Sequence, residues 1–257
     1  MKKYAMILGL VAMMAGAYGD DITINDQQLS SFFGTDSRSG IFEDQEVAYH
    51  CVTSQIWDLE AFKQDGNSLS MIGGYDFGTQ TGFLGGDIFI AVDQAPVFGS
   101  AAAGSGSGNA VVNNTFNYDY AIDLVFNGEG TGGIYNVYSL SEASTVTVYY
   151  GQNSGSNPWQ YNDGGQLVAS GSFDYAMGLS NAAVGGLQGG FHNQVSGIDL
   201  SFIEGSNTEF WAHYTMECGN DNLMGHGSTA VPEPGSLILF GTGLLGLFSL
   251  LIVRRKK

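Results

Sequence analysis

Two histidine–cysteine pairs are the first residues in this chain whose types suggest chemistry. His50 adjoins Cys51, and His213 lies five residues before Cys218. Imidazole and thiolate are common zinc ligands, and four of them complete a tetrahedral site. On a β-strand, however, side chains an odd number of residues apart face opposite sides, so each histidine points away from its cysteine. The sequence therefore predicts no metal site, and it predicts no other cofactor.

Carboxylates recur near the ends of apolar runs, a position from which calcium can collect oxygen ligands. Asp87 and Asp93 flank one such run, and Asp119 and Asp123 lie in the next. The chain contains no D-x-D-x-D-G loop. We interpret these groups as solvated carboxylates at strand ends, which also discourage association between sheet edges.

Signatures of nucleophilic catalysis are missing from the sequence. There is no G-x-S-x-G motif, and no recognisable catalytic motif contains any of the four histidines, His50, His192, His213 and His226. Paired carboxylates for glycoside hydrolysis stay open as an alternative, because their separation of roughly 5–9 Å is a property of the folded chain. We expect that the protein is not an enzyme.

The N-terminus has the pattern of a secretory signal peptide at residues 1–19. Lys2 and Lys3 form the charged start, an apolar stretch follows at residues 5–15, and small residues stand at Ala17 and Gly19. Such a segment is handled by the Sec machinery and removed by signal peptidase. A buried N-terminal helix is the alternative, but no polar residue recurs at helical spacing in the stretch.

The C-terminus combines a helix-breaking triplet, an apolar run and a basic end. Residues 235–253 are uncharged and would form a helix of roughly 28 Å, long enough for one transmembrane span. Before the run stands Pro232-Glu233-Pro234, whose prolines hold the chain extended. After it stands a basic stop-transfer cluster that stays on the cytoplasmic side, Arg254, Arg255, Lys256 and Lys257. We therefore predict an exported body that is first anchored in the inner membrane.

The charge of the body limits its partners. Residues 20–231 hold 24 of the 25 acidic residues but only Arg38 and Lys63 of the eight basic ones, a net charge of −22. Nucleic acid is excluded, because binding to phosphates requires a basic patch. The acidic surface keeps an exported protein soluble, and it repels anionic polysaccharides unless divalent cations bridge the two.

Composition and periodicity predict an all-β body, residues 20–229, folded as one β-sandwich or jelly roll. Gly, Ser, Asn, Thr and aromatic residues are abundant, which is typical of strands joined by many turns. Alternating patterns predict strands at residues 46–53, 56–62, 86–92, 118–126, 133–140, 145–150, 198–203 and 210–218. Residues 96–115 and 151–193 are predicted to be long surface loops.

The two cysteines are predicted to pair. In residues 210–218 the even-numbered side chains form an apolar face that includes Cys218, and Cys51 shares a face with Val47 and Tyr49. Disulfides persist in exported proteins, and one closing so long a loop adds about 4–5 kcal/mol to the free energy of unfolding in the chain-entropy model. Two buried free thiols are the alternative.

The ordered C-terminal trio of Pro-Glu-Pro, apolar span and basic end resembles the PEP-CTERM sorting signal of Gram-negative bacteria. In the body, the segments Cys218-Gly219-Asn220-Asp221, Trp57-Asp58-Leu59-Glu60 and Ser156-Asn157-Pro158-Trp159 look similar to stretches in the same group of proteins. The resemblance implies an exosortase as partner, with processing at Pro232, Glu233 and Pro234. It also implies β-rich proteins of bacteria that make exopolysaccharide or biofilm.

Two functional hypotheses follow for the exported body. The first is a structural or interaction role at the cell surface or in the extracellular matrix, with exopolysaccharide as a candidate partner. The alternative is a carbohydrate-binding module, or a carbohydrate-cleaving one, because sugars stack on aromatic rings. Its candidate ligand contacts are Trp159, Tyr161 and Trp211.

Overall fold

The computed structural model describes residues 19–24, 43–44, 47, 51–52, 54–78, 82–96, 108–112, 116–128, 130–141 and 143–229. The predicted signal peptide, except for Gly19, and the sorting tail at residues 230–257 lie outside the described residues. Within the described part of the chain, no helix is both long enough and apolar enough to cross a membrane.

The all-β class is confirmed. Only short 3₁₀ helices interrupt the strands in the described ranges, namely η2 (Gln55–Trp57), η5 (Gly151–Ser156) and η6 (Asn181–Val184). The strands are β1 (Asp20–Asp21), β2 (Thr23–Ile24), β3 (Leu59–Asp65), β4 (Ser68–Gly73), β5 (Ile88–Val92), β6 (Ala110–Val112), β7 (Tyr120–Phe126), β8 (Gly132–Ser139), β9 (Ser144–Val146), β10 (Gln160–Asp163), β11 (Gln166–Leu179), β12 (His192–Asp199), β13 (Glu209–Thr215) and β14 (Asn222–Ser228).

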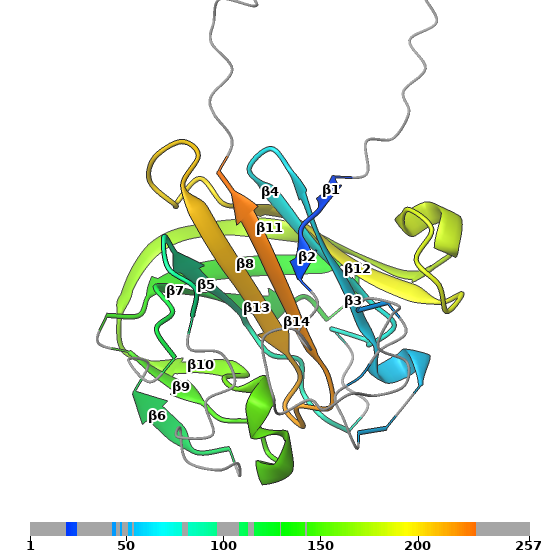
Figure 1. Cartoon of the computed structure of the whole chain (residues 1–257), viewed down its shortest axis with the longest axis horizontal. Coiled ribbons are helices and arrows are strands. Elements are labelled where there is room, and N and C mark those ends of the chain that lie inside the picture. Colours follow the sequence, from blue (N-terminus) through cyan, green and yellow to red (C-terminus); the bar gives the residue numbers. More distant parts are fainter. Residues whose placement is uncertain are drawn as a thin grey trace, which may run out of the picture.

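Eleven strands form one continuous sheet in the order β1-β3-β4-β12-β11-β8-β7-β5-β13-β14-β2, and neighbouring strands are antiparallel. Because antiparallel strands twist, so wide a sheet curls on itself. The curl brings β3 and β14 near each other, and the N-terminal segment joins them: Asp21 pairs with Lys63 of β3, and Ile24 pairs with Met224 of β14 (Figure 1). Most of the strands therefore form one large, nearly closed sheet, which differs from the two facing sheets expected of a sandwich or jelly roll.

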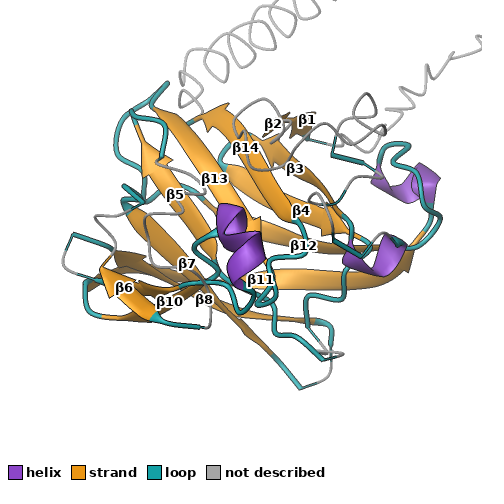
Figure 2. Ribbon diagram, turned by 60° about the horizontal axis from the view of Figure 1, so that its bottom comes forward, coloured by secondary structure: helices purple, strands orange, loops and turns teal. Residues whose placement is uncertain are grey.

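A second sheet of three strands, β10-β9-β6, packs beside the large one (Figure 2). Strand β10 contacts β7, and its Tyr161 packs against a small core on the outer face of β5, which explains why β5 is an unbroken apolar run rather than an alternating one. The side chains of β5 are buried on both faces, with Ile88 and Ile90 in the main core and Phe89 and Ala91 in a smaller core beneath the second sheet.

The main core fills the inside of the curled sheet. The predicted inward face of β13 and the turn after it is confirmed, because Phe210, Tyr214 and Cys218 all belong to this core. At the β3–β4 hairpin, Gly66 has φ 58°, a value that a two-residue turn requires and that glycine adopts without steric cost.

Strand predictions succeeded for β5, β7, β8 and β13 and matched β3 and β9 in part. They missed β4, β10, β11 and β14, and the strand predicted at residues 198–203 lies where β12 ends. The longest strand, β11, lies inside the predicted loop at residues 151–193, so that loop prediction is wrong. The composition of β11 does not indicate a strand, because most of its side chains are small or polar and exposed. Its buried side chains are Phe173 and Tyr175. The described part of the other predicted loop, residues 96–115, contains the short strand β6.

The two ends of the curled sheet carry different features (Figure 1). The start of β1 and the end of β14 lie at one end, and η2, η5 and the turn between β13 and β14 lie at the other. Since β14 has seven residues, the two ends are roughly 20 Å apart along this strand.

Candidate functional site

The turn between β13 and β14 organises one end of the fold. Asp221 is 1% exposed, and its carboxylate accepts hydrogen bonds from the backbone N–H of Leu59 at 2.6 Å and of Asn222 at 2.9 Å. The hydroxyl of Thr215 donates to the carbonyl of Asp221 at 2.5 Å. The turn therefore holds the start of β3 through buried hydrogen bonds, which are costly to leave unsatisfied.

The same turn binds a segment near Cys51. The side chain of Asn220 accepts from the N–H of Val52 at 2.8 Å and donates to the carbonyl of Val52 at 3.0 Å. Asn153 connects the two cysteines, because its Oδ1 accepts from the Cys51 thiol at 3.3 Å and its Nδ2 donates to the Cys218 carbonyl at 2.9 Å.

Both cysteines are free thiols in the structure, which therefore does not show the predicted disulfide. Cys218 is buried in the main core, as its strand parity predicted, and burial raises the pKa of its thiol to about 11. Cys51 lies in a bend and is half-buried. The described residues thus place the two cysteines on segments that Asn153 and Asn220 hold together.

Strand parity predicted that each histidine points away from its cysteine, and this is confirmed for His213. His213 faces away from the main core, and its Nε2 donates to the carbonyl of Pro158 at 2.8 Å. Burial lowers the pKa of His213 to about 4, so the ring is neutral at physiological pH. His50 lies outside the described residues.

The segments that resemble other sorted proteins meet at this end of the fold. The turn that begins at Cys218 contacts Leu59 through Asp221 and Ser156 through its hydroxyl, which donates to the carbonyl of Gly219 at 3.1 Å. Residues distant in sequence therefore build one structural unit. The sequence marked these segments but did not show that they touch.

An aromatic patch, which we define as Trp57, Phe83, Tyr149 and Tyr150, lies on the outside of this unit. Ring centroids are 6.3 Å apart for Trp57–Phe83, 5.6 Å for Phe83–Tyr150 and 5.1 Å for Tyr149–Tyr150. Tyr149 is 52% and Tyr150 38% exposed. This patch was not predicted from the sequence, although the Tyr149-Tyr150 doublet was a visible signal.

The three aromatic residues predicted to contact ligand are placed differently. Trp159 is only 5% exposed, and its backbone bonds to Asp87, just before β5, and to Val146 of β9, so it cannot stack on a sugar and that prediction is wrong. Tyr161 is half-buried and stacks on Tyr138 with ring centroids 4.5 Å apart. Trp211 is also half-buried and stacks on His226 at 4.3 Å. Each of these two rings therefore has one face covered by a neighbour.

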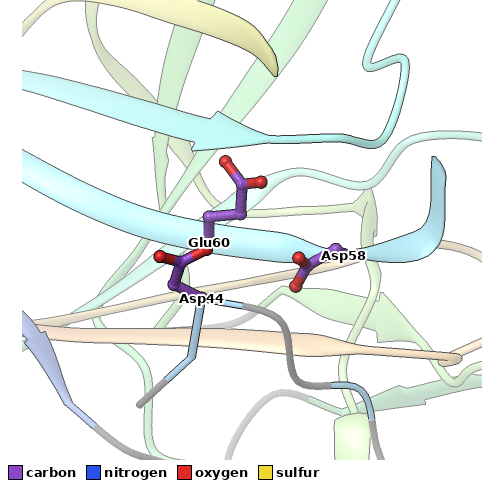
Figure 3. A group of neighbouring side chains, drawn as sticks. All are labelled: Asp44, Asp58 and Glu60. Carbon is purple, nitrogen blue, oxygen red and sulfur yellow. The ribbon is translucent and has the colours of Figure 1, made fainter. Parts of the chain in front are cut away.

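Three carboxyl groups gather next to η2, at Asp44, Asp58 and Glu60 (Figure 3). One oxygen of each lies within 4.8 Å of the others, so together they offer a set of hard ligands that suits a divalent cation. Asp58 and Glu60 are two residues apart at the start of β3, whereas Asp44 comes from a separate segment. The spacing also approaches that of a retaining glycosidase, but Asp58 and Glu60 are each only 2% exposed and a sugar ring cannot reach them.

Glu60 and His192 form a hydrogen-bonded pair behind this cluster. Glu60 Oε2 lies 2.6 Å from His192 Nδ1, and both side chains are fully buried. Burial, together with the nearby Asp58, raises the pKa of Glu60 to about 9, although a hydrogen bond from Gln55 opposes the shift. Burial lowers the pKa of His192. Both shifts favour the neutral forms of the two groups over an ion pair.

The strand-end carboxylates were predicted to be solvated, but not all of them are. Asp87 is 4% exposed, and it accepts hydrogen bonds from the N–H of Tyr161 at 2.8 Å and of Leu124 at 3.3 Å. Burial and the nearby Asp123 raise the pKa of Asp87 to about 8. The prediction of solvation is wrong for Asp87, which instead joins the small sheet to the large one, whereas Asp93 is exposed.

Comparison with known families identifies the C-terminal end of the chain. Residues 230–256 match the model of the PEP-CTERM protein-sorting motif. No curated protein and no solved structure matches the chain. The match confirms the resemblance of the C-terminal trio, and this motif indicates an exported protein that an exosortase processes.

Proposed function

We propose that the exported body is a non-enzymatic interaction protein of the cell surface or the extracellular matrix. The observation that carries this proposal is the position of the aromatic patch. The patch lies at the end of the sheet with η2 and η5, while β14 ends at Ser228, close to the start of the sorting tail, at the opposite end. A protein held at its tail would present the exposed rings of Tyr149 and Tyr150 outward.

The route of the protein is part of the proposal. The signal peptide at residues 1–19 delivers the chain through the Sec machinery, and the apolar run holds a precursor in the inner membrane. Exosortase then acts at the Pro232-Glu233-Pro234 segment, and the acidic body remains at the surface or enters the matrix.

Expression in an exosortase-positive host, with one epitope in the body and another after Lys257, tests this route. We expect the mature protein at the surface or in the matrix to keep the body epitope and to lose the C-terminal one. Replacing Pro232, Glu233 and Pro234 together by Ala should trap the precursor in the inner-membrane fraction. An extracellular form that keeps its intact C-terminus would overturn the proposal.

A carbohydrate-binding module is the second candidate. Exposed tyrosine rings favour it, because aromatic faces stack on sugar rings, and Tyr149 and Tyr150 replace Trp159 as its candidate contacts. A glycan array with and without calcium separates the two candidates. Specific binding that is lost in a Tyr149→Ala/Tyr150→Ala variant would support the carbohydrate-binding function.

A further inference from the structure

Glu217 lies where the loops of the aromatic patch meet. Its carboxylate Oε2 accepts a hydrogen bond from the N–H of Leu84 at 2.9 Å, and its carbonyl accepts one from the N–H of Tyr149 at 2.7 Å. One residue thus fastens the loop that carries Phe83 and the loop that carries the two tyrosines. The Glu217 side chain is only partly buried, so its carboxylate remains within reach of a ligand at the patch.

The two exposed tyrosines form a fixed surface. Their rings are nearly perpendicular, with an interplanar angle of 83°, and thus offer two differently directed faces. The backbone on both sides is held, because Tyr149 donates to Glu217 and the carbonyl of Tyr150 accepts from Asn153 at 3.0 Å. A surface that is ordered before binding loses little conformational entropy when a ligand stacks on it.

Charge selects among the ligands that stack on aromatic rings. Across the described ranges, Lys63 is the single lysine or arginine, and its ammonium already pairs with Asp21 at 2.7 Å. An anionic polymer therefore meets repulsion and finds no cation, whereas a polymer with ammonium groups is attracted by the whole body. An ammonium group also interacts favourably with the face of a tyrosine ring.

A second copy of the chain fits the patch less well. Four partly exposed aromatic residues offer roughly 400 Å², whereas each partner in a stable complex buries about 800 Å². Each sugar of a polysaccharide needs a smaller contact area than a protein partner, and repeated contacts along the polymer raise its affinity.

From this geometry we propose that the aromatic patch and Glu217 bind a polysaccharide whose sugars carry free amino groups. The rings of Tyr149 and Tyr150 stack on the sugar, and the carboxylate of Glu217 pairs with an ammonium group. The inference rests on the proposed surface or matrix function and names its ligand class.

Titration calorimetry on the processed protein from an exosortase-positive host tests the inference. The probes are a glucosamine hexamer, an N-acetylglucosamine hexamer, an alginate hexamer and a hexalysine peptide. We expect the glucosamine hexamer to bind at least tenfold more tightly than the other three. Equal affinity for the N-acetylated hexamer, equal affinity for hexalysine, or binding of alginate would overturn the inference.

Variants assign the binding to the patch. Tyr149→Ala/Tyr150→Ala should weaken glucosamine binding at least tenfold. Glu217→Gln, which keeps an acceptor for the N–H of Leu84, should weaken it about threefold to tenfold and reduce its dependence on salt. Leu167→Ala is the matched control, since Leu167 is also 52% exposed but lies on β11, and it should bind as the unaltered protein does.

Two further readouts keep the result interpretable. Thermal unfolding of each variant identifies a loss of binding that comes from misfolding, and Tyr149→Phe, which keeps the ring, should retain most of the affinity. Sedimentation of the free protein should show a monomer; concentration-dependent association that Tyr149→Ala abolishes would assign the patch to a second copy and overturn the inference. Retention in the matrix without glucosamine binding would refute the ligand class while leaving the surface function standing.

Discussion

Two buried carboxyl groups, Glu60 and Asp87, show how different partners give the same electrostatic result. Burial raises the pKa of both, to about 9 for Glu60 and about 8 for Asp87. Glu60 contacts the side chains of Gln55 and His192, whereas Asp87 accepts from two backbone N–H groups. The two backbone N–H groups that bond to Asp87 do not titrate, and they belong to different strands. Asp87 therefore has a structural role. One partner of Glu60, the imidazole of His192, can titrate, which makes this region sensitive to pH.

Removing the Asp87 carboxyl group should have the largest effect on stability. Asp87→Ala leaves the N–H groups of Leu124 in β7 and Tyr161 in β10 without their buried acceptor, and we expect a loss of about 3 kcal/mol in the free energy of unfolding. Urea denaturation followed by tryptophan fluorescence measures it. Asp65→Ala, on the exposed end of β3, is the control and should change stability by less than about 0.5 kcal/mol. Equal effects of the two variants would show that Asp87 does not join the sheets.

Glu60 should make the protein less stable as the pH rises. The folded-state pKa of about 9 lies above the unfolded value of 4.5, so the folded state holds more protons between these values and stability falls as pH increases through that window. Glu60→Gln removes this penalty while its amide still donates to His192. We expect a gain on the order of 2 kcal/mol at pH 8.5 and little change at pH 4.5.

Urea denaturation of both proteins at several pH values measures this difference. Asp87 titrates in the same direction, but it is present in both proteins and cancels from the comparison. A difference between them that does not vary with pH would show that Glu60 is ionised in the folded state, as in an ion pair with His192.

The smallest effect is expected at Cys51, whose half-buried thiol donates a hydrogen bond to Asn153 at 3.3 Å. In the reduced protein, Cys51→Ser should change the free energy of unfolding by less than about 1 kcal/mol. The disulfide stays a prediction for the exported protein, since Cys51 and Cys218 lie on segments that are held together. Mass analysis after thiol labelling of the unfolded, unreduced exported protein should find no free thiol; two labelled thiols would refute the disulfide.

Predictions from sequence succeeded where a single pattern contained the whole physical cause. The alternation in residues 210–218 placed Phe210, Tyr214 and Cys218 in the core, because side chains on a strand alternate whatever the strand pairs with. The same reasoning failed for β11. This strand forms through its pairing with neighbouring strands, which its own composition does not indicate. Trp159 was predicted to contact a ligand because sugars stack on aromatic rings, but its side chain is only 5% exposed, and no local pattern indicates that burial.

The candidate site was predictable only in part. The Cys218-to-Asp221 and Trp57-to-Glu60 segments were marked by resemblance, and the acidic charge was evident from composition. The grouping of Asp44 with Glu60, the pairing of Glu60 with His192 and the contact of Phe83 with Tyr150 join segments far apart in the chain. No local pattern encodes such contacts.

The sequence by itself determined the destination of this protein, because a sorting motif is read as a linear segment, and it determined the β-rich class and the charge of the body, because strand periodicity and composition are local properties. The tertiary structure alone decided that the sheet closes on itself, that Asp87 and Glu60 are buried, and that four aromatic residues from three segments form one surface. Burial and proximity are produced by long-range packing, and so the features that bear on binding appear only in the folded chain.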